Sequence, residues 1–361
     1  MTDPVLAAGY MARALRLAER GRNTTHPNPS VGCVIVRDGE IVGEGFTQPA
    51  GQAHAERQAL GQAGERARGA EMFVTLEPCS HFGRTPPCAD AVIAAGIRKV
   101  WAALEDPNPK VAGQGMARLR AAGIEVEVGL MQAEARRGLR HYLSRMQRGR
   151  PWLTLKIGAS LDGRTAMASG ESRWITGAEA RADVHRLRAE AGAVLTSSAT
   201  VLADDPELTV RLPGDWRQPD RIVLDTQGRV APAARVWAAG ARRYWLSASA
   251  TPSLEGVTAL QIARDAGGHL SLPAAMAALG EQGVNAALVE CGPLLAGALL
   301  QAGLVDELLA YVSPSLLGHD ARPLARLPGL ERLSERIVLE WQDVRRVGDD
   351  LRLTLRPRVE G

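Results

Sequence analysis

The sequence predicts an α/β protein built from two domains. Its 361 residues exceed the usual size of a single domain, about 100–200 residues. β-rich segments alternate with helical segments in both halves, a pattern typical of parallel strands joined by helices. A polar stretch ending in proline, QRGRPW at 147–152, interrupts this alternation. We therefore place the domain boundary there, with one domain at 1–148 and a second at 149–361.

In the N-terminal half, Asp3 and Pro4 suit the N-cap and first position of an amphipathic helix. Two β-rich runs, 31–36 and 41–46, flank Asp38-Gly39, which is a strong signal for a two-residue hairpin turn. The other elements expected here are a helix at 54–68, a strand at 72–76, a helix at 88–95, a strand at 99–104, and a helix and a strand within 114–128.

The C-terminal half shows a second alternation, with no sequence repeat of the first. No G-x-G-x-x-G follows a strand there, so the usual dinucleotide fingerprint is absent. The elements expected are a strand at 152–160, a helix near 178–190, strands within 191–197, 221–226, 242–248 and 285–290, a helix from Leu294, and a strand within 305–312.

Composition excludes several classes of protein. The net charge is +3 and the arginines are scattered among acidic residues, so neither nucleic acid nor a membrane surface is indicated as a partner. The longest apolar stretch, 287–305, is interrupted by Glu290, Gly292-Pro293 and Gln301, which does not suit a membrane span. Four cysteines in a chain of this length do not form a disulfide framework. We therefore expect a cytoplasmic protein.

One histidine, one glutamate and two cysteines predict a catalytic zinc site. Such a site takes three His or Cys ligands and leaves one position for water, and His54, Cys79 and Cys88 supply that set. Glu56 stands two residues after His54, placed to move protons without binding the metal. The order matches the zinc deaminase signature H-x-E…P-C-x-x-C. A lone cysteine such as Cys33, within an apolar strand, is instead expected to be inert.

The spacing of the two cysteines departs from that signature. Eight residues, SHFGRTPP, separate Cys79 from Cys88, where the signature has two. An insertion between two ligands must fold at the mouth of the site, and His81, Arg84 and Thr85 suit a polar or phosphorylated substrate. We favour substrate contact for His81. The alternative is that His81 is a fourth ligand and the zinc only a structural staple.

In the second half, the residue types alone indicate binding or catalytic sites less clearly. The stretch 196–211 combines hydroxyls, aspartates and an arginine that suit phosphate or ribose, although composition alone favours a solvated loop. The stretch 288–300 runs from a strand through Gly-Pro into a helix, which is either an anion site or a tight turn without ligand. Lys156 and Asp162 could belong to structural ion pairs, and Trp174 could be core or a stacking surface.

Three stretches of the first half closely resemble the deaminase half of the bifunctional riboflavin-biosynthesis deaminase/reductase family. They are HPNPSVGCVIV at 26–36, HAERQAL at 54–60 and TLEPCSHFGRTPPCADAVIAAGI at 75–97. In that family the eight-residue spacer is the norm. The resemblance implies a cytidine-deaminase-like three-layer domain, in which Asn28 would contact the pyrimidine.

The second half resembles the reductase half of the same family, which has a dihydrofolate-reductase-like fold and uses NADPH. The matching stretches are 155–177, 187–211, 221–227 and 289–307, whereas 232–283 matches weakly. The resemblance implies that substrate and its phosphate are held by Ser172, Arg188, Leu208, Arg211 and Glu290. It implies that NADPH is held by Gly158, Trp174, Thr200, Asp204, Thr226 and a loop of Gly292, Pro293, Leu294, Leu295, Ala296, Gly297 and Ala298. Cys291 stands where many relatives have glycine.

The resemblance implies two consecutive reactions. The first is zinc-dependent hydrolytic deamination of 2,5-diamino-6-(5-phosphoribosylamino)pyrimidin-4(3H)-one, and the second is NADPH-dependent reduction to 5-amino-6-(5-phosphoribitylamino)uracil. It also implies a homo-oligomer formed through the reductase domain. The alternative is a nucleic-acid deaminase with an RNA-binding second domain, which would need a basic groove and stacking aromatics. Aromatic residues make up only 4% of the chain, which disfavours that alternative.

Overall fold

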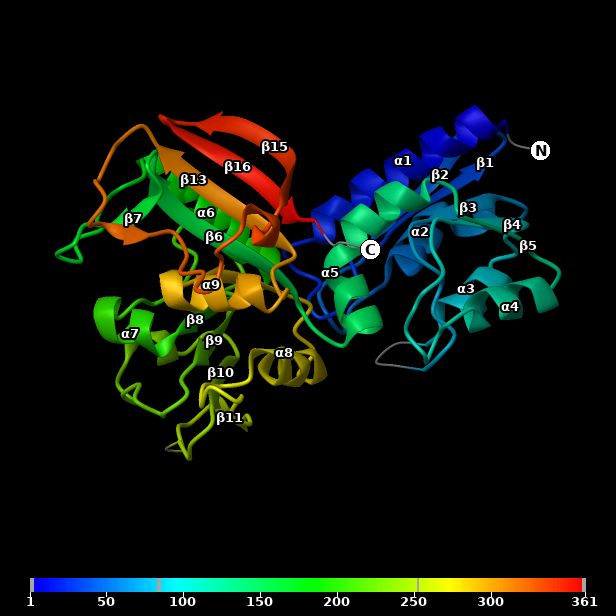
Figure 1. Cartoon of the computed structure of the whole chain (residues 1–361). Coiled ribbons are helices and arrows are strands. Elements are labelled where there is room, and N and C mark those ends of the chain that lie inside the picture. The colour runs from blue at the N-terminus through cyan, green and yellow to red at the C-terminus, as the bar shows by residue number, and fades with distance from the viewer. Residues whose placement is uncertain (1–2, 83–85, 252, 359–361) are drawn as a thin grey trace. The chain divides into compact units, whose positions relative to one another are not determined.

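The computed structural model describes residues 3–82, 86–251 and 253–358. The chain divides into two compact units, 1–149 and 150–361 (Figure 1). The first unit closes with a helix that ends at Arg148 and is capped by Gly149, whose positive φ of 67° suits a residue without Cβ. Pro151 follows shortly after and cannot continue the helix. No helix in the described ranges is both long and apolar enough to cross a bilayer.

The N-terminal unit alternates helices with short strands along the chain. Its elements are α1 (Pro4–Gly21), β1 (Gly32–Arg37), β2 (Glu40–Phe46), α2 (Ala55–Ala63), the 3₁₀ turn η1 (Gly64–Ala67), β3 (Glu71–Val74), α3 (Cys88–Ala94), β4 (Lys99–Ala102), α4 (Gln114–Ala121), β5 (Glu125–Val128) and α5 (Gln132–Arg148).

These strands form one sheet in the order β2-β1-β3-β4-β5. Only β3, β4 and β5 pair in parallel, because β1 runs antiparallel to both of its neighbours. The parallel pairing expected from the alternation is therefore incomplete. The hairpin that reverses β1 turns at Asp38 and Gly39, both with positive φ, which confirms the turn predicted there.

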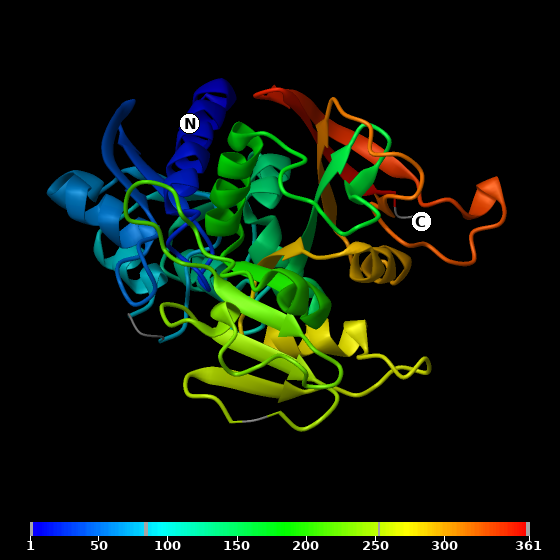
Figure 2. The same ribbon diagram turned by 90° about the vertical axis from the view of Figure 1, so that its left-hand side faces the viewer.

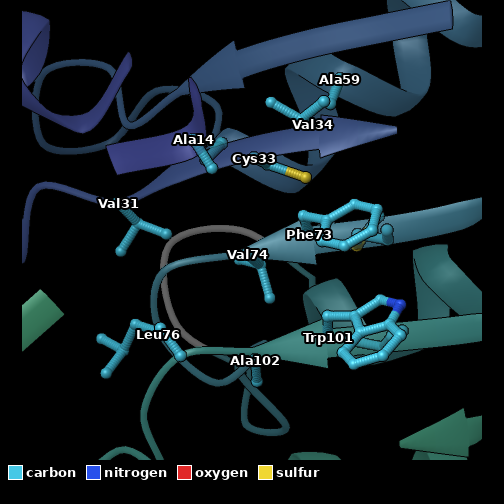
Figure 3. Close-up of a cluster of buried hydrophobic side chains, with 14 of the residues drawn as sticks. Ala14, Val31, Cys33, Val34, Ala59, Phe73, Val74, Leu76, Trp101 and Ala102 are labelled. Atoms are coloured by element: carbon cyan, nitrogen blue, oxygen red, sulfur yellow. The ribbon is translucent and has the colours of Figure 1, made fainter. Parts of the chain in front are cut away.

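Helices cover both faces of this sheet, which confirms the three-layer arrangement. α1, with α5 beside it, packs on one face, and α2, α3 and α4 lie on the other (Figure 1). On the α1 face, Phe73 of β3 stacks on Trp101 of β4 with ring centroids 5.8 Å apart (Figure 3). Cys33 is fully buried on β1, and burial raises the pKa of its thiol well above the usual range, as expected for an inert core residue.

The C-terminal unit contains most of the remaining strands in one large sheet. Its elements are β6 (Trp152–Ser160), β7 (Arg164–Ala166), α6 (Ala178–Ala191), β8 (Ala193–Ser197), α7 (Ser198–Asp204), β9 (Asp220–Leu224), η2 (Arg235–Trp237), β10 (Arg243–Ser247), β11 (Val257–Gln261), α8 (Leu272–Glu281), β12 (Ala286–Glu290), α9 (Pro293–Gln301), β13 (Glu307–Ser313), β14 (Arg322–Pro323), η3 (Leu333–Glu335), β15 (Leu339–Val347) and β16 (Asp350–Pro357).

The nine-stranded sheet has the order β11-β10-β9-β8-β12-β6-β13-β16-β15. Pairing is parallel from β11 to β13 and antiparallel in the last two pairs. Figure 2 shows β9, β10 and β11, in yellow-green to yellow, side by side at one edge. Side chains of α8 and α9 pack with Ala287 and Val289 of β12, whereas α6 packs with Leu288 between them. Because neighbouring residues of a strand face opposite ways, helices cover both faces of this sheet too.

Candidate active sites

Three elements of the N-terminal unit bring a histidine and two cysteines together. His54 is the N-cap of α2, Cys79 follows β3, and Cys88 opens α3. The Nδ1 atom of His54 lies 3.7 Å from Sγ of Cys79 and 3.4 Å from Sγ of Cys88. The backbone N–H of Cys88 donates to Sγ of Cys79 at 3.3 Å. The Cys88 side chain, followed by His54, lowers the pKa of the Cys79 thiol, which favours thiolate there.

This spacing fits tetrahedral zinc. Bonds of about 2.0–2.3 Å to nitrogen and sulfur separate neighbouring ligand atoms by roughly 3.3–3.8 Å, and the three observed ligand atoms lie within 4.8 Å of one another. Among the residues that the structure describes, no further His, Cys, Asp or Glu joins this group, and His81 lies outside it. Three protein ligands leave a coordination position open, as in catalytic rather than structural zinc sites.

Glu56 lies in the first turn of α2, beside the ligand group. The residue is only 4% exposed, and its carboxyl group interacts with the Cys88 side chain. Burial, with the nearby Cys79 charge, raises the pKa of Glu56 to about 7. A carboxyl group in such surroundings can both accept and donate a proton near neutral pH.

A cavity of about 350 Å³ opens onto these residues. Asn28 and His81, the two side chains expected to contact substrate here, both line it, together with His54, Glu56 and Cys79. Arg84 and Thr85, the other candidates in the spacer, lie outside the described residues. Seven polar residues that line the cavity were not predicted: Thr47, Gln52, Glu77, Asp106, Asn108, Tyr142 and Arg145.

Two of the missed residues belong to one loop after β4. Asp106 accepts a hydrogen bond from the Tyr142 hydroxyl of α5 at 2.9 Å, and from the backbone N–H of Asn108 at the same distance. A sequence signal for this loop does exist. The stretch DPNP at 106–109 follows shortly after the carboxyl end of β4, a strand parallel to β3, and ligand sites gather at that edge of parallel sheets.

In the C-terminal unit, the core of the candidate site is a buried ion pair. Nε and Nη2 of Arg188 on α6 donate to the two carboxylate oxygens of Glu290, at 2.6 and 2.9 Å. Lys156 on β6 stands opposite Glu290 in the strand register. Burial lowers the pKa of Lys156. Burial opposes ionisation of Glu290 as well, but Arg188 outweighs it and lowers the pKa of that carboxyl.

The other predicted substrate residues surround this pair to different degrees. Nη1 of Arg188 donates to the carbonyl of Thr209 at 2.7 Å, and Nη1 of Arg211 donates to the hydroxyl of the same threonine at 3.2 Å. Leu208, directly before Thr209, is buried and has a positive φ of 54°. Ser172 is half-buried in the loop before α6. The structure therefore brings Arg188, Arg211 and Glu290 together.

The predicted cofactor residues lie on several neighbouring segments. Trp174 is 68% exposed, and the Arg181 guanidinium lies 4.5 Å from its ring centroid, so Trp174 is a surface residue rather than core. Asp204 ends α7, where it lies 3.8 Å from Arg173. The remaining positions are Gly158 on β6, Thr200 on α7, Thr226 after β9 and Gly292 before α9.

The cofactor segment from Gly292 to Ala298 is mostly helical, which confirms the helix expected from Leu294. Gly292 is the N-cap of α9, and Pro293 to Ala298 already belong to that helix. Ala296 is buried in the core, and a Cβ on Gly297 would lie 1.7 Å from the Arg326 carbonyl oxygen. Gly297 is thus explained by close packing, and the free N–H groups of the first helical turn are the part suited to an anion.

Lys156 and Asp162 do not pair with each other. Asp162 accepts hydrogen bonds from Ser160 and from the backbone N–H groups of Leu317 and Gly318, whereas Lys156 faces Glu290. Asp162 therefore anchors the segment after β13, and Lys156 belongs to the site.

Comparison with known proteins covers both units. The family model described as "RibD C-terminal domain" matches residues 151–353, and "Cytidine and deoxycytidylate deaminase zinc-binding region" matches residues 6–104. The chain is 55% identical to the riboflavin biosynthesis protein RibD of Escherichia coli (strain K12) over 360 residues, which cover 96% of this chain and 98% of that protein. It is 39% identical to RibD of Bacillus amyloliquefaciens, covering 97% and 96%.

Solved structures agree. Acinetobacter baumannii RibD, form 1, superposes with a TM-score of 0.92 at 43% identity, covering 99% of this chain and 100% of that chain. A Thermotoga maritima diaminohydroxyphosphoribosylaminopyrimidine deaminase/5-amino-6-(5-phosphoribosylamino)uracil reductase superposes with a TM-score of 0.88 at 32% identity, covering 98% and 99%. Nothing in these relationships favours a nucleic-acid deaminase, and the dihydrofolate-reductase-like fold expected of the second half is confirmed. The chain therefore belongs to the RibD family, the bifunctional deaminases and reductases of riboflavin biosynthesis.

Proposed function

We propose that this protein deaminates 2,5-diamino-6-(5-phosphoribosylamino)pyrimidin-4(3H)-one and then reduces the product to 5-amino-6-(5-phosphoribitylamino)uracil. Deamination is assigned to residues 1–148 and reduction to residues 149–361. The observation that carries the proposal is the group of His54, Cys79 and Cys88 beside buried Glu56, at a cavity.

In the deaminase site, His54, Cys79 and Cys88 would hold one zinc ion. The metal, when bound, supplies a nucleophilic water at neutral pH. Glu56 takes a proton from the attacking water and passes protons to the departing amine, so that water replaces the amino group and ammonia leaves. Asn28 and His81 line the cavity, and we assign them to contacts with the pyrimidine and its substituents.

In the reductase site, NADPH, when bound, supplies a hydride to C1′ of the ribosyl group, and a proton completes the opened ribityl chain. Nε and Nη2 of Arg188 already donate hydrogen bonds to the Glu290 carboxylate. The Arg211 side chain is half exposed and its ion pair with Glu207 is a longer contact of 3.7 Å. We therefore assign the substrate phosphate to Arg211 rather than to both arginines. Lys156 is our candidate for the proton donor.

We assign residues to NADPH contacts from their places on neighbouring segments of the C-terminal unit. Gly158, Trp174, Thr200, Asp204 and Thr226 would contact NADPH. The N–H groups at the start of α9, from Gly292 onward, suit a cofactor phosphate. We further propose a cytoplasmic homo-oligomer that associates through the reductase unit, and the free thiols of all four cysteines suit a reducing compartment.

One coupled assay tests the proposal. The diaminopyrimidine phosphate is supplied with and without NADPH, and ammonia and NADPH absorbance are followed together. We expect ammonia in both cases, and NADPH oxidation only after ammonia has formed. NADPH oxidation on the diamino substrate without ammonia release would contradict the proposed order of reactions.

A further inference from the structure

Glu77 stands between β3 and the ligand Cys79, and its carboxylate is almost completely buried. No lysine, arginine or histidine forms a salt bridge with it among the described residues. Its two oxygens instead accept hydrogen bonds of 2.8–3.2 Å from the backbone N–H groups of Asp106, Gly113, Gly115 and Met116. Each oxygen accepts two of these bonds, so the carboxylate is fully used by the backbone.

We call residues 105–113 the β4–α4 loop. The N–H groups of Asp106 and Gly113 lie at its two ends, and those of Gly115 and Met116 lie in the first turn of α4. The first N–H groups of a helix lack partners within the helix, and α4 has neither an acidic residue in its first turn nor a side-chain cap of its own. Glu77 supplies both the missing acceptor and the negative charge that a helix N-terminus favours. The loop is therefore tied to the strand that leads to Cys79.

Packing around this contact is tight. A Cβ on Gly115 would lie 2.0 Å from the carbonyl oxygen of Pro78, the residue between Glu77 and Cys79. The start of α4 thus rests directly on the turn that carries a metal ligand. The Glu77 hydrogen bonds and this close contact together hold the loop against the segment that carries Cys79.

The same loop forms part of the cavity. Asp106, Asn108 and Val111 all line it. Asp106 is held further by the Tyr142 hydroxyl at 2.9 Å. The position of these cavity-lining groups relative to Glu56 therefore depends on how the loop is tied at its ends.

We infer that Glu77 is a positioning residue for deamination, holding the β4–α4 loop so that Asp106 and Asn108 form the substrate-binding wall of the cavity. The inference rests on the proposed deaminase function. The role requires a carboxylate at position 77, because all four hydrogen-bond partners of Glu77 are N–H donors. An amide in its place would set two N–H donors against its own N–H₂ group.

The test compares Glu77→Gln with a matched control in the full-length protein. We expect Glu77→Gln to raise KM for deamination by about 10- to 100-fold, since small misplacements of binding groups cost up to that much. We expect kcat and zinc content to change little, because loss of binding shared by ground and transition states raises KM alone. The control is Glu71→Gln, which alters another buried carboxylate in the same sheet, bonded to Arg98 and Trp101.

Glu71→Gln should lower the melting temperature without changing KM. A second measurement, amide hydrogen exchange, should show the N–H groups of Asp106, Gly113, Gly115 and Met116 losing protection in Glu77→Gln only. If Glu77→Gln fails to fold, Gly113→Ala provides a second test. Gly113 has a φ of 77°, so alanine there strains the end of the loop next to α4, and it should also raise KM.

Unchanged KM in a folded Glu77→Gln protein, or unchanged exchange at the four amides, would overturn the inference. So would loss of zinc with collapse of kcat, which would make Glu77 a support for the metal instead. Failure of the proposed function is distinct from these results, because it would appear as absence of ammonia release by the unaltered protein, while exchange still reports on the loop.

Discussion

At the residue scale, Glu56 is the group on which the deamination chemistry depends. It sits in the first turn of α2, two residues after His54, so the same helix start places a metal ligand and a proton carrier. The helix turns by about 100° per residue, and this separation lets Glu56 lie beside the ligand group without belonging to it.

Replacing Glu56 by glutamine keeps the shape of the side chain but removes its ability to take a proton. We expect Glu56→Gln to lower the rate of ammonia release by about 10²- to 10⁴-fold. Reduction of substrate that has already been deaminated should be unchanged. Zinc content measured on the same preparation controls for loss of metal, and ammonia release at the original rate would disprove the role assigned to Glu56.

The second residue-scale prediction concerns Glu290, whose pKa is lowered in the folded protein by Arg188 despite burial. Glu290→Gln would leave Arg188 and Lys156 buried without their carboxylate, which should cost about 3–5 kcal/mol of unfolding free energy at pH 7. A lowered folded pKa stabilises the fold above the unfolded pKa, about 4.3 for glutamate, and this stabilisation is lost as pH falls through the folded value.

Urea unfolding of the unaltered protein and of Glu290→Gln at several pH values checks the direction of this pH dependence. The difference in stability between them should be full at pH 7 and should shrink as the pH is lowered below about 4.3. A difference that grew on acidification would show that Glu290 is not held ionised by Arg188.

Sequence alone could predict the residues whose type is diagnostic. His54, Cys79, Cys88 and Glu56 form a recognised order of ligands and carboxylate, and the structure brings them together. Tyr142 could not be predicted in the same way. A tyrosine on an amphipathic helix is usually core, and only the fold places its hydroxyl against Asp106 at the cavity.

At the scale of elements, α2 is held close to the sheet by glycines of β2. A Cβ on Gly45 would lie 2.2 Å from the carbonyl oxygen of Ala55, and one on Gly43 would lie 2.2 Å from that of Ala59. Both carbonyls belong to the helix that begins immediately after His54. The position of the metal ligand therefore depends on two residues that have no side chain.

Gly45→Ala should force α2 away from the sheet. Overpacking of this kind costs typically about 1–3 kcal/mol, and here we expect it to reduce zinc content and ammonia release together while reduction of deaminated substrate continues. Gly61→Ala is the matched control, because it lies on the same helix with open space around it. That control should be neutral or stabilising by up to about 1 kcal/mol.

Full zinc content and full deaminase activity in Gly45→Ala would contradict this account of α2. Metal analysis and the ammonia assay on both variants decide the question.

Element prediction succeeded where local chemistry determines the structure and failed where distant contacts do. Asp38-Gly39 determines its own turn, since both residues adopt positive φ. The antiparallel pairing of β1 with β3 depends on where the chain re-enters the sheet after α2. No local sequence pattern determines that position. The helix expected from Leu294 is confirmed and begins one residue earlier, at Pro293, because proline is favoured in the first turn of a helix.

At the scale of the whole molecule, each compact unit contains its own candidate site. The metal group and its cavity are built entirely from residues of the first unit, and the Arg188–Glu290 pair from residues of the second. Loss of one activity should therefore leave the other intact. The central claim is that one chain carries a zinc-dependent deaminase and a zinc-independent reductase.

Metal removal tests that claim most directly. The full-length protein is stripped with a chelator, zinc is measured, and ammonia release and NADPH oxidation are assayed on the diamino and the deaminated substrate respectively. The account predicts that ammonia release disappears and returns when about one zinc per chain is restored, while NADPH oxidation continues throughout. Ammonia release from zinc-free protein, or loss of both activities together from a folded chain, would contradict it.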